Sequence, residues 1–148
     1  MAYWLYKSEP STWSWEQQIA AGAAGTHWNG VRNHVAKKHL MAMEVGERGF
    51  FYHSNEGKAV VGIVEVCGLA HPDSTADDPR WECVDIRAVM DLPNPVTLDV
   101  CKSEPRLKDM VLVTNSRLSV QPVGEAEFAA ICEMGGLDVA AGAGTGKR

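Results

Sequence analysis

The chain has 148 residues and carries 14 Lys and Arg against 19 Asp and Glu, a formal net charge of −5. This length predicts one domain with its own hydrophobic core, and the acidic balance excludes a protein that coats nucleic acid or anionic membrane through its overall charge. Hydrophobic residues make up 45% of the chain, which excludes a disordered protein, and no run reaches the roughly 20 apolar residues of a membrane span, so we expect a soluble globular domain.

The first predicted elements are a strand and a short helix. Residues 4–7 favour a strand that ends before Pro10, because proline lacks a backbone donor and biases the residue before it toward an extended shape. Ser14 and Gln17 have the spacing of a capping box, which predicts a helix through about Ala21. Glycines at positions 22 and 25 end that helix.

A second helix is expected from near Val31 to Ala42. Residues three or four apart share one side of a helix. The apolar residues Val31, Val35 and Ala42 are therefore predicted to pack, and Asn33, His34 and Lys37 are predicted to share another side that is available for contacts.

The central part of the chain predicts three strands. Residues 48–53 alternate, which places Phe50 and Tyr52 on one face and Phe51 and His53 on the other. Residues 59–67 are apolar and β-branched almost throughout, as in a strand buried on both sides, and complete a hairpin with the preceding strand. Residues 81–90 alternate again and predict a half-buried strand.

The last third of the chain predicts short helices and one more strand. Thr97 can cap a short helix, and the apolar spacing of residues 107–111 indicates another helical turn. A strand over residues 118–120 is expected to stop at Pro122. A final helix covers residues 125–134, with acidic residues in its first turn and Gly135 beyond its end.

The order of these elements, β-α-α-β-β-β-α-β-α with a hairpin at its centre, predicts an α+β domain built on a small curved or closed sheet with peripheral helices. Residues 1–136 are expected to form this domain. Residues 137–148 are rich in Gly and Ala and lack any anchoring side chain, so they are expected to form a flexible tail.

The cysteine and histidine spacing argues against a metal site. The four cysteines form no CxxC pair. His34 and His39 are five residues apart on a predicted helix and do not share the face that ligands at i and i+4 need. The N-terminal segment also lacks the pattern of a secretory signal. We therefore expect reduced, mostly buried thiols in a cytoplasmic protein, with no metal and no cofactor.

Trp28 is the most informative aromatic residue, because it lies among turn formers rather than in a periodic apolar element. It can be either a core anchor or a contact residue. A run of five basic or histidine side chains follows within residues 32–39, with no acid between them. Such a run is either a solvated face or, beside a stacking ring, a site for a nucleotide, whose base offers a π-face and whose phosphate is negative.

Catalysis has weaker support. Lys7 and Glu9 lie at a strand end, where a lysine with a lowered pKa can act as a general base, or the two can form a loop salt bridge. His53 and Ser54 are adjacent on a strand and point to opposite faces, so they cannot pair as base and nucleophile. Neither GxSxG nor HExxH is present.

Four blocks, taken together and in order, resemble the EVE domain family over about residues 2–135. The blocks are YWLYKSEP at residues 3–10, WNGVRN at 28–33, GFFYHSN at 49–55 and SRLSVQPV at 116–123. The resemblance implies a PUA-like fold, a small mixed β-barrel with flanking helices, akin to the YTH readers of methylated adenosine in RNA.

The resemblance also implies a function and a site. The function is binding without chemistry of a modified base, chiefly a modified cytosine in DNA rather than RNA, flipped into an aromatic pocket. By this resemblance, Trp28 is expected to stack on the base. The other base-binding residues are Ser8, Glu9, Asn33, Tyr52, His53, Ser54 and Ser119, and the phosphate-binding residues are Lys7, Arg32, Lys37 and Arg117.

Two positions depart from the family pattern. Asn29 stands where the family pattern has Asp, which removes a carboxylate acceptor and can change the base preference. His34 stands where many relatives carry Tyr.

Two other functions stay open. The alternative to a reader is a small hydrolase of a modified nucleoside, similar to ASCH proteins, in which Lys7 and Glu9 form the catalytic pair. A protein-interaction module that uses the same groove is a third hypothesis.

Overall fold

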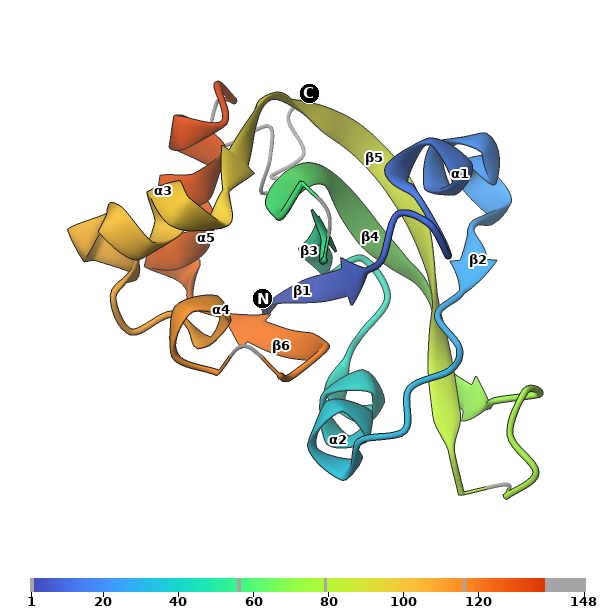
Figure 1. The fold of residues 1–148 in the computed structure, drawn as a ribbon. Helices are drawn as coiled ribbons and strands as arrows, with labels where there is room; N and C mark the ends of the chain where they lie inside the picture. The colour runs from blue at the N-terminus through green and yellow to red at the C-terminus, as the bar shows by residue number, and fades with distance from the viewer. Residues whose placement is uncertain (1, 56, 79, 116, 138–148) are drawn as a thin grey trace.

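The structure is a computed structural model that describes residues 2–55, 57–78, 80–115 and 117–137. Its centre is one six-stranded sheet with the strand order β2-β5-β4-β3-β1-β6 (Figure 1). β1 and β3 run parallel, and every other neighbouring pair is antiparallel. The strands span Tyr3–Ser8 (β1), Thr26–His27 (β2), Arg48–His53 (β3), Ala59–Pro72 (β4), Glu82–Thr97 (β5) and Val120–Val123 (β6).

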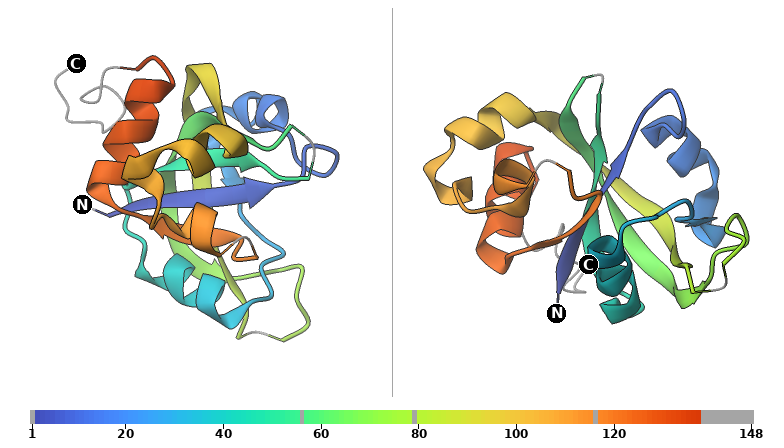
Figure 2. Two further views of the ribbon diagram at one scale, coloured as in Figure 1. Left: turned by 60° about the vertical axis from the view of Figure 1, so that its left-hand side comes forward. Right: turned by 60° about the horizontal axis from the view of Figure 1, so that its bottom comes forward.

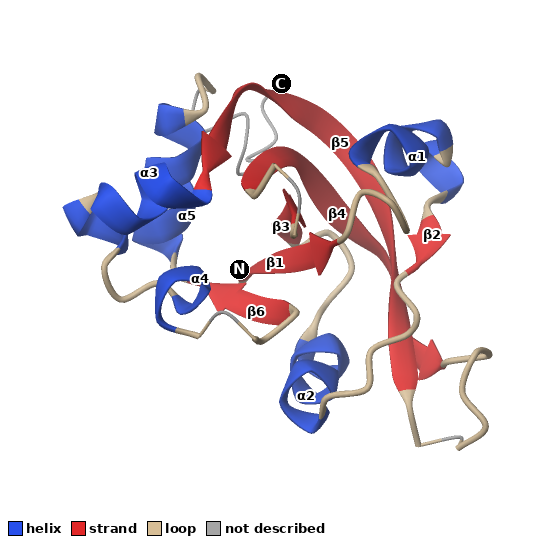
Figure 3. Cartoon of the chain, viewed as in Figure 1, coloured by secondary structure: helices blue, strands red, loops and turns tan. Residues whose placement is uncertain are grey.

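Helices cover both faces of the sheet (Figure 3). The C-terminal helices α3, α4 and α5 gather on one side, whereas α1 lies on the other, as two further views show (Figure 2). The α-helices span Trp15–Ala20 (α1), His34–Ala42 (α2), Leu98–Ser103 (α3), Val111–Thr114 (α4) and Glu125–Met134 (α5), and short 3₁₀ turns cover Gly22–Ala24 (η1) and Pro105–Leu107 (η2).

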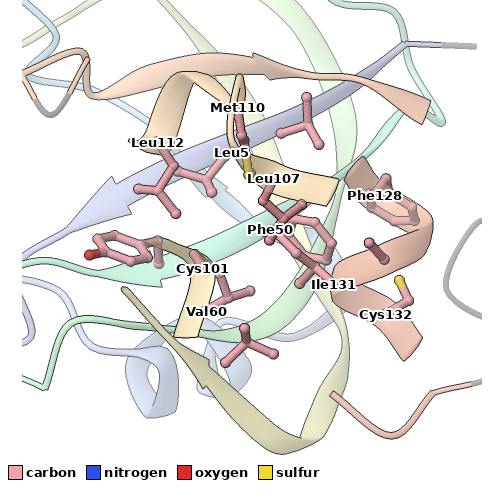
Figure 4. Packing of buried hydrophobic residues seen from close by; sticks show 14 of the residues in the cluster. Leu5, Phe50, Val60, Cys101, Leu107, Met110, Leu112, Phe128, Ile131 and Cys132 are labelled. Atoms are coloured by element: carbon pink, nitrogen blue, oxygen red, sulfur yellow. The ribbon is translucent and has the colours of Figure 1, made fainter. Parts of the chain in front are cut away.

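Two hydrophobic cores lie on opposite faces of the sheet, and β3 contributes to both. Phe50 and Tyr52 belong to the core under the C-terminal helices. There Phe50 stacks on Phe128 (Figure 4), with a centroid distance of 4.6 Å. Phe51 belongs to the second core, which includes four aromatic residues besides Phe51 and packs against α1 and α2. The predicted alternation along this strand is therefore confirmed.

The sheet is mixed, as predicted, but it is not closed into a barrel. Among the described residues, β2 and β6 are its two edges. Helix α2 contacts both β5 and β6, which are four places apart in the strand order. The sheet therefore curls around α2, and this helix fills part of the gap that a closed barrel would close with strand pairing.

Helix α2 differs from the expectation in its start and in its buried face. Asn33 caps it, with its side-chain oxygen accepting from the backbone N–H groups of Val35 and Ala36 at 2.9 and 3.0 Å. The buried residues are Ala36 and Leu40, whereas Val35 is 51% exposed. Val31 is buried, as predicted, but it precedes the helix. The prediction is wrong for Val35 and Ala42, which are exposed, because the helix that begins after the cap at residue 33 turns Ala36 and Leu40 toward the core.

The last strand also differs from the expectation, since it runs through Pro122 instead of stopping there. β6 pairs with β1, with Trp4 opposite Pro122. Among the described residues β6 has no second neighbour. An edge strand tolerates proline because the missing N–H need not face a partner strand.

The four cysteines are free thiols, and three of them, Cys83, Cys101 and Cys132, are buried, which confirms the prediction of mostly buried thiols. Burial raises the pKa of Cys101 to about 11 and that of Cys132 to about 12, so these thiols stay protonated at neutral pH.

The described fold extends to Leu137, which packs against the core under the C-terminal helices although the tail is predicted to begin there. The remainder of that predicted tail, residues 138–148, lies outside the described residues. Within the described part of the chain, no helix has the length and apolar character needed to cross a bilayer.

Candidate functional site

A cavity of about 480 Å³ opens at the carboxyl end of β1. Its lining comes from three parts of the chain that are distant in sequence, namely residues 7–9 with 12–13, residues 26–32, and Ser119. The backbone N–H of Lys7 donates to the carbonyl of Ser119 at 2.9 Å, which joins the segment before β6 to the end of β1. The cavity thus forms where β1 leaves the sheet and the chain between β2 and α2 crosses it.

The loop after β1 fixes Trp13 in the cavity wall. Ser8 Oγ donates to the carbonyl of Trp13 at 2.6 Å, and the backbone N–H groups of Thr12 and Trp13 donate to the carbonyl of Glu9 at 2.9 Å. The indole N–H of Trp13 donates to the buried Gln18 at 2.9 Å. Trp13 is therefore held through both its backbone and its ring, while its side chain stays half-buried at the cavity.

Trp28 is both a core residue and a cavity wall. It is 8% exposed and makes edge contacts with Tyr6 and Phe51 at centroid distances of 5.5 and 5.7 Å. Its backbone N–H donates to the carbonyl of Val84 at 2.7 Å, which continues the pairing of β2 with β5. The two readings of Trp28 from sequence are therefore compatible, because one side of the indole packs and the residue still lines the cavity.

Asp73 holds the loop that carries Arg32. The loop N–H of Gly30 donates to Asp73 Oδ2 at 2.8 Å, and Arg32 Nη1 donates to the same oxygen at 3.0 Å. Gly30 has a φ of +83°, a conformation that suits glycine. Burial opposes ionisation of Asp73, but hydrogen bonds from Thr75, Gly30 and Arg32 outweigh it and lower the pKa of Asp73 to about 2.

Lys7 and Glu9 both line the cavity, as predicted. Burial lowers the pKa of Lys7, whose Nζ lies 5.8 Å from the ring centroid of Tyr52. Glu9 is exposed, and its Oε2 accepts a hydrogen bond from Asn55 Nδ2 at 2.8 Å. The cavity rim thus holds a lysine and an arginine beside one carboxylate, so positive charge gathers locally in an acidic protein.

Six of the predicted site residues are brought together in the cavity, namely Lys7, Ser8, Glu9, Trp28, Arg32 and Ser119. Three others lie at the end of β3, next to β1 but outside the lining. Tyr52 is buried in the core under the C-terminal helices, and His53 Nε2 accepts from the backbone N–H of Trp15 at 3.1 Å. Ser54 is tied to β1 by its backbone N–H, which donates to the carbonyl of Ser8 at 2.9 Å.

The remaining three predicted residues also lie outside the lining. Asn33 is the cap of α2. Lys37 Nζ lies 5.9 Å from the ring centroid of Trp81, on whose ring His34 also stacks. Arg117 is exposed, and its backbone N–H donates to Asn115 Oδ1 at 3.2 Å.

Sequence reasoning missed Trp13, His27 and Asp73. Trp13 carried a signal, since it belongs to the cluster of tryptophans in the first 28 residues. Asp73 carried none, because it lies in a loop of turn formers and reaches the cavity loop only through tertiary structure.

Comparison with known proteins agrees with this architecture. The EVE domain model matches residues 2–134. Human thymocyte nuclear protein 1 is 34% identical over 159 residues, which covers 86% of this chain and 71% of the human protein.

Solved structures extend the likeness to the whole fold. A protein from Agrobacterium tumefaciens is 61% identical with a TM-score of 0.91, covering 93% of this chain and 94% of that one. Human THYN1, in a complex with 5-methylcytosine-containing DNA, is 32% identical with a TM-score of 0.86, covering 93% and 99%.

A YTH domain from Zygosaccharomyces rouxii is 18% identical with a TM-score of 0.57, covering 93% of this chain and 88% of that one, and it shares the fold alone. The PUA-like class predicted from sequence is therefore confirmed. The family match spans nearly the whole chain, and this chain belongs to the EVE domain family.

Proposed function

We propose that this protein is a non-catalytic reader that binds one modified base, flipped out of a nucleic acid, in the cavity at the end of β1. The observation that carries the proposal is the lining itself, in which the indoles of Trp13 and Trp28 occur together with Lys7 and Arg32. A base offers a π-face to an indole, and its flanking phosphates attract cations. A modified cytosine in DNA is the ligand we propose, because human THYN1 forms a complex with 5-methylcytosine-containing DNA.

The polar groups of the cavity suit the edge of a base. Ser8, Glu9 and Asn29 line it beside the two indoles, and they supply hydroxyl, carboxylate and amide groups. Their mixture of donors and acceptors can satisfy a Watson–Crick edge once the base leaves the stack. Glu9 can accept from an exocyclic amino group, and Asn29 can both donate and accept.

The overall charge sets the expected mode of binding. With a net charge of −5, the protein has little attraction for bulk duplex. Lys7 and Arg32 are the cations of the lining, and two phosphate contacts predict a slope of about −2 for log K against log salt. Flipping a base costs a few kcal/mol in a paired duplex, so single-stranded or mismatched sites should bind more tightly.

Tryptophan fluorescence during titration tests the proposal. The ligands are short DNA oligonucleotides with cytosine, 5-methylcytosine, 5-hydroxymethylcytosine or N6-methyladenine at one unpaired position. Burial of one methyl group contributes about 0.8 kcal/mol, so 5-methylcytosine should bind roughly fourfold more tightly than cytosine. Equal affinity for all four ligands, or no binding at low salt, would contradict the proposal.

A hydrolase remains the second candidate because burial lowers the pKa of Lys7, as a general base requires. Its partner in that hypothesis, Glu9, is engaged by Asn55. Incubation with acylated and alkylated cytidines separates the two functions. We expect no released base or acid from any of them, and turnover that disappears in Lys7→Gln would favour the hydrolase.

Asn33 provides a separate test of how far the site extends. Asn33→Ala is expected to lower the free energy of unfolding by about 1 kcal/mol, because two N–H groups of α2 lose their acceptor. Asn33→Ser retains a capping oxygen but lacks the amide. Urea unfolding measures the stability of both variants. Oligonucleotide titration should give affinities equal to that of wild type for both. Weaker oligonucleotide binding by Asn33→Ser, at unchanged stability, would indicate that the Asn33 amide contacts the base.

A further inference from the structure

A group of metal-ligating side chains lies on the part of the sheet formed by β2, β5 and β4. His27, His71 and Asp85 come from these three neighbouring strands, and their ligand atoms all lie within 4.8 Å of one another. His27 Nδ1 and His71 Nε2 converge on the same oxygen, Asp85 Oδ1, at 2.5 and 2.8 Å. We refer to these residues as the His27–His71–Asp85 cluster.

Backbone pairing fixes the cluster. His27 lies directly opposite Asp85 in the β2/β5 ladder, and Gly68 lies opposite Asp85 in the β4/β5 ladder. A register shift between Gly68 and His71 brings the histidine over the same carboxylate. A Cβ at position 68 would overlap Asp85 Oδ2, so glycine at that position leaves the space in which the carboxylate lies.

The hydrogen bonding of His71 calls for either a protonated imidazole or a metal ion beside its Nε2. Its Nδ1 faces the backbone carbonyl of Pro72 at 3.3 Å, and its Nε2 faces Asp85 Oδ1 at 2.8 Å. A neutral imidazole has only one N–H and cannot donate to both acceptors. A metal ion between Nε2 and the carboxylate would leave Nδ1–H for Pro72, and ligating histidines commonly donate their second ring N–H to a carbonyl in this way.

We propose that the His27–His71–Asp85 cluster binds one divalent transition-metal ion of the zinc class, through His27 Nδ1, His71 Nε2 and the Asp85 carboxylate. Two imidazoles and one carboxylate favour Zn²⁺ and similar ions over Mg²⁺ and Ca²⁺, which prefer oxygen ligands. Metal–ligand bonds of 2.0–2.2 Å place the ligand atoms of a tetrahedral site about 3.4 Å apart. The ligand atoms of the cluster lie within 4.8 Å of one another, so small side-chain rotations are enough to reach that geometry. The side chains of His27 and His71 are 62% and 36% exposed, which allows those rotations and gives solvent access to the fourth position.

Such an ion would lie next to the cavity. His27 lines the cavity and precedes Trp28, and β2 consists of Thr26 and His27 only. An ion that joins β2 to β4 and β5 would therefore fix the start of the cavity loop. The inference does not depend on the proposed function, because metal affinity is measured without any nucleotide.

Isothermal titration of untagged, chelator-treated protein with zinc sulfate tests the proposal, with Mg²⁺ as a parallel ligand. We expect one equivalent of Zn²⁺ and no Mg²⁺ in the wild type. His27→Gln and His71→Gln should each weaken zinc binding by more than about 100-fold. The matched controls are His34→Gln, an exposed histidine outside the cluster, and Cys67→Ser, a nearby thiol, and both should bind zinc like the wild type.

Two results would overturn the proposal. One is the absence of zinc binding by wild type, which would indicate that a protonated His71 satisfies both acceptors. The pKa of His71 is raised by its hydrogen bond to Asp85, consistent with that alternative. The other is zinc binding that survives in His27→Gln. Because the His27 side chain is mostly exposed, this variant is expected to keep the fold, and circular dichroism verifies it.

Discussion

Trp28→Ala is expected to lower the free energy of unfolding by about 3–5 kcal/mol and to weaken oligonucleotide binding by roughly 5- to 150-fold. The stability loss follows from removing a buried indole that contacts Tyr6 and Phe51, which leaves a void in the core on the α1 and α2 side. The binding loss follows from removing one wall of the cavity, since stacking of a base on an aromatic ring contributes about 1–3 kcal/mol. Urea unfolding and fluorescence titration measure the two effects separately.

Trp28→Phe separates the packing role from the stacking role. Phenylalanine retains a ring in the core, so the stability loss should be smaller than in Trp28→Ala, while part of the stacking surface is lost. Trp15→Phe is the matched control, because Trp15 is buried in the same core but does not line the cavity. It should lose stability and keep its affinity for the oligonucleotide. Equal affinities in Trp28→Phe, Trp28→Ala and wild type would exclude a stacking role for Trp28.

Asp73→Ala should lower the free energy of unfolding by roughly 2–3 kcal/mol at pH 7 and weaken oligonucleotide binding about tenfold. The carboxylate is buried and accepts from Gly30, Arg32 and Thr75, and removing it leaves these donors without a partner. The affinity falls because Gly30 and Arg32 lose the group that positions them in the cavity wall. Asp77→Asn is the matched control, because Asp77 is an exposed carboxylate in the same loop.

The contribution of Asp73 should depend on pH with a definite sign. Its pKa in the folded protein is about 2, below the ordinary value of 3.8. The stabilisation of roughly 2 kcal/mol is therefore fully present above about pH 5 and is lost as the pH falls through 4 toward 2. Urea unfolding of wild type and Asp73→Asn between pH 7 and pH 2 should give stability curves that converge at the acid end. A difference in unfolding free energy between the two proteins that stays constant from pH 7 to pH 2 would contradict a lowered pKa of Asp73.

Much of the local structure follows from the sequence, because strands and caps depend on neighbouring residues. The alternation of Phe50 and Phe51 decided which core each side chain enters. Ser14 with Gln17 and Thr97 cap their helices as their side chains predict. These predictions succeed because side-chain alternation along a strand and helix capping both depend on only a few consecutive residues.

The buried face of helix α2 and the edge position of strand β6 did not follow from the sequence. Spacing alone could not distinguish a buried Val35 from a buried Ala36, since either stripe of α2 is short and weakly apolar. Proline at position 122 predicted the end of a strand, yet β6 is an edge strand, where proline is tolerated. Both outcomes depend on which element packs against which, a property of the whole fold.

The site divides in the same way. The sequence by itself determined the family and the part of the cavity built from two short segments, with Lys7, Ser8 and Glu9 at a strand end and Trp28 and Arg32 in one loop. Only the tertiary structure decided that Asp73 holds that loop and that His27, His71 and Asp85 meet. The reason is that the pairing of β2, β5 and β4 brings His27, Asp85 and His71 into contact, and Asp73 follows β4 directly, so these contacts leave no periodic signal along the chain.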